Sequence, residues 1–360
     1  MFARGGDRPA IFLVYVDDIL VLAPPGGGIE AVKKELLALF KGTDLGPAHH
    51  CLGIRIVRDD VAGTISLDQE RYAEEVLARF GMSKSDPVKT PLCSKKPLRK
   101  ATEDDIRCDI RIYQAVVGCL AYLAQGTRPD LAFAVSTLGK FSSDPTEEHM
   151  IAAKRVLRYI RGTSGAKLTF GGSKGEDEVE GYVDADWAAD RDDRRSMSGF
   201  VFTMAGGAVS WGSRKQGAVA LSTAEAEYVA AGVAGREVLL LSGAVAAARK
   251  ELGCITINCD NQAAIQLVKN PNSHHDRSKH VDIVHHWIRD KAQEGAFAFQ
   301  YVPTDLNPAD AFTKALGQIK HRQHAEAIGV ALALGAWIPG SEGATSVDTA
   351  SGAERECENR

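Results

Sequence analysis

The sequence predicts a mixed α/β (α+β) fold, and three patterns support this class. Three short apolar segments with strand character lie close together within residues 179–212. Strand-like and helix-like segments then alternate from residue 222 to residue 316. Ahead of them, residues 109–161 contain three amphipathic stretches with helical spacing. Strands that lead into strand–helix alternation predict an α/β layer domain of roughly 140 residues, preceded by a helical region.

The first half of the chain predicts hairpins followed by helices. Asp17 and Asp18 lie between the two apolar strands of the first hairpin, and the second hairpin turns near Ala62. Pro129 and Pro145 stand near helix starts, where proline is tolerated. The predicted elements are a hairpin at 10–23, a helix at 29–41, a hairpin at 49–69, a helix at 69–80, a loop or linker at 81–107, and helices at 109–125, 129–142 and 146–161.

The second half predicts one further domain. The span 162–180, with its glycines and acids, is expected to be a domain boundary. The predicted elements that follow are strands at 179–186, 198–203 and 207–212, a helix at 222–250, a strand at 254–259, a helix at 261–269, a basic loop, a helix at 281–294, a strand at 296–302 and a helix at 308–316. Residues 317–360 become small and polar, which predicts a mobile tail.

Length and composition narrow the class of protein. The 360 residues suggest two or three domains, and 44% apolar residues are enough to build cores. The seven cysteines include no C-x-x-C pair, so we expect no zinc knuckle and a reducing, intracellular setting. The run VLLLSGAVAAA is short of the about 20 residues of a bilayer helix, and no secretory signal is apparent. A membrane partner is therefore not expected.

The net charge of −4 argues against a uniformly basic nucleic-acid binder. Basic segments nevertheless occur at 154–163, 191–196 and 212–217, while acidic residues elsewhere offset them in the sum. A polyanionic partner is therefore compatible with the charge pattern.

Four acidic residues stand in four separate sequence contexts. They are Asp184 in GYVDADW, Glu227 in LSTAEAEYVAA, Asp260 in ITINCDNQAA and Asp310 in VPTDLNPADAFTK. Two belong to strand-like and two to helix-like segments. Hard cations such as Mg2+ prefer oxygen ligands, and a pair of them can clamp the attacking and leaving oxygens of a phosphodiester. The set predicts a two-metal phosphodiester cleavage site.

Each acid also has a plainer explanation. Asp184 and Asp186 point to the same face of one strand, which an exposed strand edge would also allow. In the helix that begins near Ser222, Glu225 fits a capping box. Glu227 lies roughly 200° further around that helix and is the better ligand candidate.

The other two acids stand at helix starts. Asp260 ends a strand, where open α/β sheets place ligands, but it could simply cap the next helix. Asp310 would lie in a first helical turn behind Asn307 as cap and Pro308, where the helix dipole favours an acid. The four acids together favour the metal site over four separate structural roles.

From about residue 10 to residue 316 the chain resembles the carboxy-terminal part of the Pol polyprotein of copia-type LTR retrotransposons. The resemblance rests on long phrases in a fixed order. They are YVDDIL, CLGIRI, ISLDQERYAEEVLARFGM, TRPDLAFAVSTLGKFSSDPTEEHMIAAKRVLRYIRGT, GYVDADWAADRDDRRSMSGFVF, VSWGSRKQGAVALSTAEAEYVAA, CDNQAAIQLVKNP, SKHVDIVHHWIRD and VPTDLNPADAFTKAL.

The resemblance implies two activities and their parts. The implied regions are a partial reverse transcriptase palm with the YVDD hairpin at 1–68, helical thumb and connection segments at 69–165, a ribonuclease H-like mixed sheet flanked by helices at 179–316, and a flexible tail at 317–360. The ribonuclease H domain would cut the RNA strand of RNA–DNA hybrids with two Mg2+ ions, Mn2+ being an alternative. Its implied metal-binding acids are Asp184, Glu227, Asp260 and Asp310, with Asp186 as an accessory residue.

Asp17 and Asp18 match the second metal-binding motif of the polymerase. A polymerase also needs an earlier palm aspartate and fingers, which would lie upstream of Met1. We therefore expect no primer extension by this chain alone, and polymerase activity only in a full-length ancestor. Many ribonuclease H enzymes carry a histidine on the loop before the last aspartate, and this loop has none. His280 is the candidate substitute; the alternatives for the neighbouring histidines are a solvated loop or a zinc site.

Hybrid recognition would rest on backbone, 2′-hydroxyl and shape, with little base reading. The candidate phosphate contacts are Arg194, Arg195, Arg214, Lys215, Arg277 and Lys279, although such side chains are often merely solvated. One alternative is a catalytically inactive remnant that binds nucleic acid or a polymerase partner. Another is association with the rest of a reverse transcriptase or with a second copy, favoured if the apolar helices at 109–142 were exposed. The expected location is a cytoplasmic virus-like particle or the nucleus.

Overall fold

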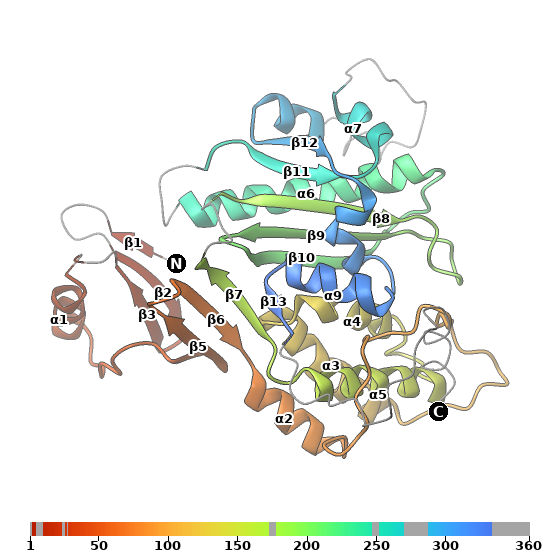
Figure 1. The fold of residues 1–360 in the computed structure, drawn as a ribbon, viewed down its shortest axis with the longest axis horizontal. Helices are drawn as coiled ribbons and strands as arrows, with labels where there is room; N and C mark the ends of the chain where they lie inside the picture. Colours follow the sequence, from red (N-terminus) through yellow and green to blue (C-terminus); the bar gives the residue numbers. More distant parts are fainter. Residues whose placement is uncertain are drawn as a thin grey trace, which may run out of the picture.

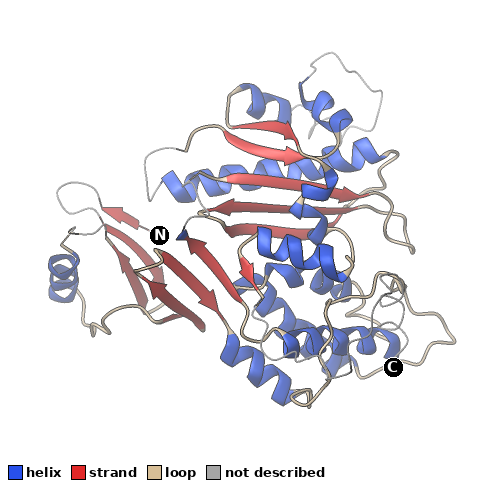
Figure 2. Ribbon diagram, in the orientation of Figure 1, coloured by secondary structure: helices blue, strands red, loops and turns tan. Residues whose placement is uncertain are grey.

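Three β-sheets and a group of helices make up the computed structural model, which describes residues 2–4, 10–23, 26, 28–172, 178–246, 252–269 and 287–332 (Figure 1). Helices and strands are interspersed throughout the described chain, as Figure 2 shows. The predicted mixed α/β (α+β) class is therefore confirmed.

The first sheet contains the predicted YVDD hairpin. Its strands are β1 (Phe2–Arg4), β2 (Ala10–Tyr15) and β3 (Asp18–Leu22), in the order β1-β2-β3, and α1 (Ile29–Leu39) follows. Tyr15 pairs with Asp18, so the two-residue turn is Val16 and Asp17, and Asp18 already belongs to β3. Val16 has a φ of 53°, as tight hairpin turns require.

The second sheet joins the beginning of the chain to its later parts. It is antiparallel, with the order β13-β7-β6-β5-β4, and consists of β4 (His50–Cys51), β5 (Ile54–Asp59), β6 (Thr64–Asp68), β7 (Lys167–Gly171) and β13 (Val330–Ala331). The predicted hairpin at 49–69 is confirmed. The predicted boundary at 162–180 is wrong in part, because β7 pairs with β6 on one side and β13 on the other. The five residues of β7 form a strand because they pair with strands from distant parts of the chain.

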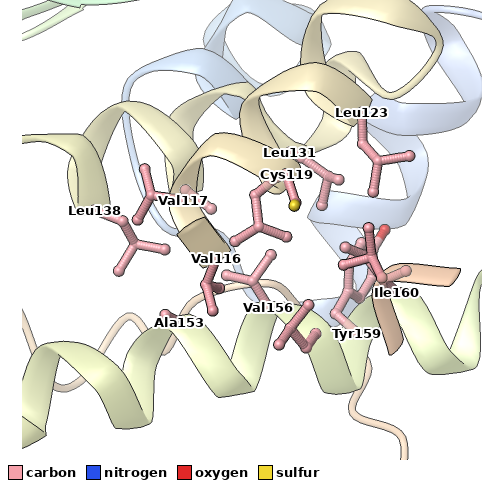
Figure 3. Packing of buried hydrophobic residues seen from close by; sticks show 14 of the residues in the cluster. Val116, Val117, Cys119, Leu123, Leu131, Leu138, Ala153, Val156, Tyr159 and Ile160 are labelled. Atoms are coloured by element: carbon pink, nitrogen blue, oxygen red, sulfur yellow. The ribbon is translucent and has the colours of Figure 1, made fainter. Parts of the chain in front are cut away.

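The helical region packs around one apolar core (Figure 3). Its elements are α2 (Glu70–Arg79), α3 (Ile110–Gly126), the 3-10 helix η1 (Pro129–Leu131), α4 (Ala132–Gly139) and α5 (Glu147–Gly162). Asp109 caps α3 by accepting the backbone N–H groups of Arg111 and Ile112 at 2.8 and 3.2 Å. Most apolar residues of 109–142 are buried, Leu120, Leu131 and Leu138 completely, although Ile110, Ile112 and Tyr122 are exposed. Large exposed apolar side chains also occur in the β2–β3 hairpin.

The third sheet matches a ribonuclease H-like mixed sheet flanked by helices. Its order is β10-β9-β8-β11-β12, antiparallel among β8, β9 and β10 and parallel from β8 through β11 to β12. Its elements are β8 (Glu180–Asp186), β9 (Met197–Met204), β10 (Gly207–Lys215), α6 (Thr223–Ala246), β11 (Ile255–Cys259), α7 (Gln262–Lys269), a helical stretch at 287–293, β12 (Phe297–Tyr301), and the 3-10 helices η3 (Thr304–Leu306) and η4 (Pro308–Phe312).

Helix α6 crosses one face of this sheet (Figure 1). By length and composition alone α6 could cross a membrane, but it packs against β8 and β9 and contributes Ala226, Ala230 and Ala234 to their core. It is therefore the core helix of the sheet.

The predicted mobile tail at 317–360 is wrong for its first part. Helix α9 (Gln318–Ala327) and β13 lie between the third sheet and the helical region (Figure 1). Ala325, Ile328 and Val330 join Leu168 and Phe312 in a shared core, and the Ile328 carbonyl accepts the Ala208 N–H at 2.9 Å. Residues 317–332 contain few buried apolar residues among many polar ones, so composition did not indicate that this segment packs against the core. Residues 333–360 lie outside the described part of the chain.

Candidate active site

Strand β8 brings Asp184 to the centre of the third sheet. β8 lies between β9 and β11, and Asp184 is only 2% exposed. The alternating strand geometry places Val183 and Ala185 in the core under α6, so Asp184 and half-buried Asp186 face the opposite side. An exposed strand edge does not explain Asp184.

Helix α6 provides the second acid. The Ser222 hydroxyl accepts the N–H of Glu225 at 3.2 Å, and Glu225 in turn accepts the N–H of Leu221 at 2.8 Å. Glu225 therefore stabilises the start of the helix, as predicted. Glu227 is buried and accepts the backbone N–H of Ala185, while its Oε2 atom has no hydrogen-bond partner among the described residues.

Asn307 explains how Asp310 reaches the site. Its side-chain oxygen caps η4 by accepting the N–H of Ala309 at 3.1 Å, and its amide donates to the Val183 carbonyl of β8 at 2.9 Å. One side chain thus starts the short helix and fixes it to the strand that carries Asp184. Asp310, in the first turn, is 1% exposed.

The acids converge at one point. One oxygen each of Asp184, Asp260 and Asp310 lies within 4.8 Å of the others. A second group of ligand atoms, from Glu227, Cys259 and Asp260, meets the same limit. Asp260 belongs to both groups because it follows β11, whose Cys259 is in register with Val183 of β8. Asp186 is in neither group.

Burial dominates the electrostatics of this cluster. It raises the pKa of Glu227 to about 9, assisted by the charges of Asp184 and Asp260. It also raises the pKa of Asp184 to about 6, although the nearby Lys314 ammonium acts in the opposite direction. Burial likewise raises the pKa of Asp186. Glu227 therefore needs added positive charge nearby to be ionised at neutral pH.

Two lysines supply part of that charge, and the sequence predictions did not include them. Lys314 Nζ lies 3.0 Å from Asp310 Oδ1 and 3.5 Å from Asp184 Oδ2, and Lys320 Nζ lies 2.7 Å from Asp310 Oδ2. Thr313 donates its hydroxyl hydrogen to Asp184. Thr313 and Lys314 follow Asp310 at helical spacing in DAFTK, a signal that could have predicted both. Lys320 comes from α9, which was expected to be mobile.

The donor atoms suit a hard divalent cation. Asp184, Glu227, Asp260 and Asp310 offer only carboxylate oxygens, and the buried Glu227 Oε2 has no described partner. Burial raises the pKa of the Cys259 thiol, so that thiol stays protonated and is a poor ligand. The four carboxylates therefore fit the coordination chemistry of Mg2+.

Asp17 and Asp18 are placed quite differently. Both side chains are exposed, at the turn and at the first residue of β3. Within the described residues, neither belongs to a group of three potential metal ligands. Their role as polymerase ligands stays a prediction.

The predicted phosphate contacts have different surroundings. Arg194 and Arg214 are exposed, and Arg195 lies 3.6 Å from Asp193. Lys215 is held by Asp190 at 3.1 Å and by Asp193 at 2.9 Å, so its charge is already paired within the protein. His280, Arg277 and Lys279 lie outside the described residues, as do the neighbouring histidines at 274, 275, 285 and 286.

The chain is similar to several proteins of retroelements. Residues 1–94 match the family model described as reverse transcriptase (RNA-dependent DNA polymerase). The retrovirus-related Pol polyprotein from transposon TNT 1-94 of Nicotiana tabacum is 41% identical over 329 residues, which are 89% of this chain and 24% of that protein. A putative transposon Ty5-1 protein of Saccharomyces cerevisiae is 35% identical over 231 residues, covering 64% of this chain and 74% of its own length.

Solved structures with a related arrangement include nucleases and a reverse transcriptase. An N-terminal ribonuclease H domain from Mycobacterium tuberculosis, fused to maltose-binding protein, overlaps 42% of this chain and 98% of its own at 12% identity and a TM-score of 0.30. A foamy viral protease-reverse transcriptase in complex with RNA/DNA hybrid overlaps 81% of this chain and 36% of its own at 12% identity and a TM-score of 0.47.

The sequence relatives define the family. The chain spans about a quarter of the length of the Pol polyproteins it matches, with 24% for TNT 1-94 and 22% for transposon RE1 of Arabidopsis thaliana, to which it is 36% identical. It covers 74% of the yeast Ty5-1 relative. The chain belongs to the Pol polyproteins of copia-type LTR retrotransposons.

Proposed function

We propose that the third sheet and its helices form a ribonuclease H that cleaves the RNA strand of RNA–DNA hybrids by two-metal hydrolysis. The observation that carries the proposal is the convergence of Asp184, Asp260 and Asp310 oxygens within 4.8 Å, next to buried Glu227. Three separate elements deliver the first three acids, and a fourth delivers Glu227. Without bound cations, such a cluster lowers the stability of the fold, because buried like charges repel one another.

These four acids would hold the cations, Mg2+ or Mn2+. When bound, the cations supply the charge that activates water and stabilises the departing 3′ oxygen. The residues of the chain orient the site: Thr313 donates to Asp184, and Asn307 fixes η4 against β8. Lys314, placed between Asp184 and Asp310, balances their charge.

The substrate class follows from the same chemistry and from the exposed basic residues. Arg194 lies in the loop after β8, and Arg214 lies near the end of β10. Both are at the end of the sheet where β8 carries Asp184 and Asp186. Exposed guanidinium groups at this edge suit contacts to phosphates. Binding to the hybrid is expected to weaken steeply as the salt concentration rises.

The proposal is tested with the purified chain, a labelled RNA–DNA hybrid and Mg2+. Cleavage of the RNA strand alone, absent with EDTA and in the Asp184→Asn variant, is the expected result. The matched control, Asp290→Asn, changes an exposed acid of the helical stretch at 287–293 that is outside both ligand groups. Absence of cleavage by the folded wild-type chain would contradict the proposal and favour a remnant that only binds nucleic acid.

A further inference from the structure

The two oxygens of Asp310 are held from different directions. Lys314 contacts Oδ1 at 3.0 Å and also lies 3.5 Å from Asp184. Lys314 therefore bridges Oδ1 of Asp310 and the carboxylate of Asp184. Lys320 contacts the other oxygen, Oδ2, at 2.7 Å from α9. The two lysines thus contact different oxygens, so Lys320 can fix the orientation of the Asp310 carboxylate without occupying Oδ1.

The residue after Lys320 anchors α9 to the helical region. His321 is 5% exposed, and its Nε2 lies 3.1 Å from the hydroxyl of Tyr159 on α5. That hydroxyl donates its only hydrogen to Asp130 Oδ2 at 2.8 Å. His321 must then be the donor in its own contact with Tyr159. Burial lowers the pKa of His321, which agrees with a neutral ring carrying its hydrogen on Nε2.

Asp130 in turn is fixed inside the helical region. Arg128 binds both of its oxygens, at 2.9 and 2.7 Å, and donates to the carbonyl and hydroxyl of Thr163 at 3.0 and 2.9 Å. Arg128, Asp130 and Tyr159 are all nearly inaccessible to solvent. Buried polar chains whose members are all partnered are rigid. A continuous series of hydrogen bonds therefore connects Arg128 and Asp130, in the core of the helical region, through Tyr159 to His321 of α9.

We propose that α9 is a positioning element of the active site, in which Lys320 orients Asp310 and the His321–Tyr159–Asp130 chain fixes α9 to the helical region. This inference rests on the proposed function to the extent that Asp310 is a cation ligand. Hydrogen-bond partners behind a metal ligand set its orientation, and losing one typically lowers metal affinity or activity by about 10- to 100-fold. The helical region would thus act on the nuclease chemistry through α9.

The role of Lys320 is tested in the 360-residue chain with Lys320→Met and Lys320→Arg. The probe is Tb3+, whose luminescence lifetimes in H2O and D2O report how much water is bound to the ion. We expect Lys320→Met to add bound water, because Asp310 no longer points steadily at the ion, and Lys320→Arg to retain the wild-type lifetimes. Lys291→Met, which removes a surface pair with Glu294 of 2.6 Å, is the matched control and should resemble wild type.

Cleavage kinetics give the second readout. Lys320→Met should lower kcat about tenfold or more with little change in KM for the hybrid. Tyr159→Phe, which removes only a hydroxyl, should change both readouts in the same direction but less. Its control is Tyr122→Phe, since the Tyr122 hydroxyl donates to the Leu52 carbonyl at 2.9 Å, in the β4–β5 turn.

Wild-type lifetimes in Lys320→Met would overturn the inference, and so would a Tyr159→Phe variant that melts earlier without altering either readout. If the wild-type chain binds Tb3+ but does not cleave the hybrid, the proposed function fails, and the lifetimes still decide whether Lys320 positions Asp310.

Discussion

The chain contains two acidic motifs that the structure treats in opposite ways. The aspartates of the YVDD hairpin are adjacent in sequence, and both are exposed on a hairpin whose side chains Val14, Tyr15 and Val16 are also exposed. Asp184 and Asp310 are 126 residues apart in number, yet they are nearly inaccessible and share Lys314 as a partner. Among the described residues, the adjacent acids have no third potential ligand close by, whereas the distant acids converge.

The difference shows that an acidic motif is not yet a metal site. The buried cluster has a partner for most of its groups: Thr313 for Asp184, Lys314 and Lys320 for Asp310, and the Ala185 backbone for Glu227. The exposed hairpin has no comparable surroundings among the described residues. Burial and neighbouring groups, more than the acids themselves, distinguish the two regions.

The largest expected effect tests this distinction directly. Glu227→Gln should slow hybrid cleavage at least about 100-fold, because removing one charge from a metal-binding site costs several kcal/mol of transition-state stabilisation. Asp17→Asn should leave the rate unchanged. Initial rates on the labelled hybrid check both variants, and a similar loss in the two would refute the distinction.

The second test concerns the support behind the cluster. Ile328 is fully buried at the end of α9, whereas Ile319, at its start, is 74% exposed. We expect Ile328→Ala to lower the free energy of unfolding by about 2–5 kcal/mol through the cavity it leaves, and to reduce cleavage as α9 loosens. Ile319→Ala should change stability by less than about 0.5 kcal/mol. Chemical denaturation followed by circular dichroism measures both, and equal effects would contradict the assigned packing of α9.

The third test uses pH without metal. The folded-state pKa of Asp184 is raised from 3.8 to about 6, so between these values the folded chain binds more protons than the unfolded chain. Stability in EDTA should therefore fall as pH rises through this window, by roughly 3 kcal/mol from Asp184, at 1.36 kcal/mol per pKa unit. Glu227, raised from 4.5 to about 9, extends the fall to higher pH.

Thermal unfolding in EDTA at several pH values, compared with Glu227→Gln, provides the measurement. The variant should lack the fall at the alkaline end, and Mg2+ added to the wild type near pH 8 should restore stability by favouring the ionised carboxylates. A wild-type stability that rises across the whole range relative to the variant would show that the cluster is not buried as described.

The smallest effect tests the close approach of η4 to the sheet. A Cβ at Gly199 of β9 would lie 2.7 Å from both Phe312 Cβ and Thr313 Cγ2. Gly199→Ala should therefore cost about 1–3 kcal/mol of stability and displace Thr313 from Asp184. Gly118→Ala, on α3 with nothing within 4 Å, should instead stabilise by up to about 1 kcal/mol. Differential scanning calorimetry checks both, and a neutral Gly199→Ala would contradict the close contact.

Much of the fold was predictable, because many elements carry local signals. Apolar spacing located α2, α3 and α5 to within a few residues, and Asn307 with Pro308 correctly predicted the start of η4. β7 and α9 were missed. Their few buried residues, such as Leu168 and Ile328, pack against residues from distant parts of the chain. Periodicity within one segment does not reveal such contacts.

The site was predictable to the same extent. Asp184, Asp260 and Asp310 converge as expected, since strand ends and a helix cap are local features that sheet topology brings together. Lys314 could have been inferred from its spacing after Asp310, whereas Lys320 could not, because its helix was expected to be mobile. Lys215 was taken for a phosphate contact, and only the structure shows that Asp190 and Asp193 hold its ammonium.

The sequence by itself determined the family, the order of most elements and the identity of the acids, because motifs, caps and apolar spacing act over a few residues. Tertiary structure alone decided which acids are buried together, which lysines neutralise them and how the helical region reaches the site through α9. Burial and charge pairing depend on chain segments that meet only after folding. The pKa of a buried acid, and the contacts that position it, therefore depend on the folded molecule and not on any single segment of the sequence.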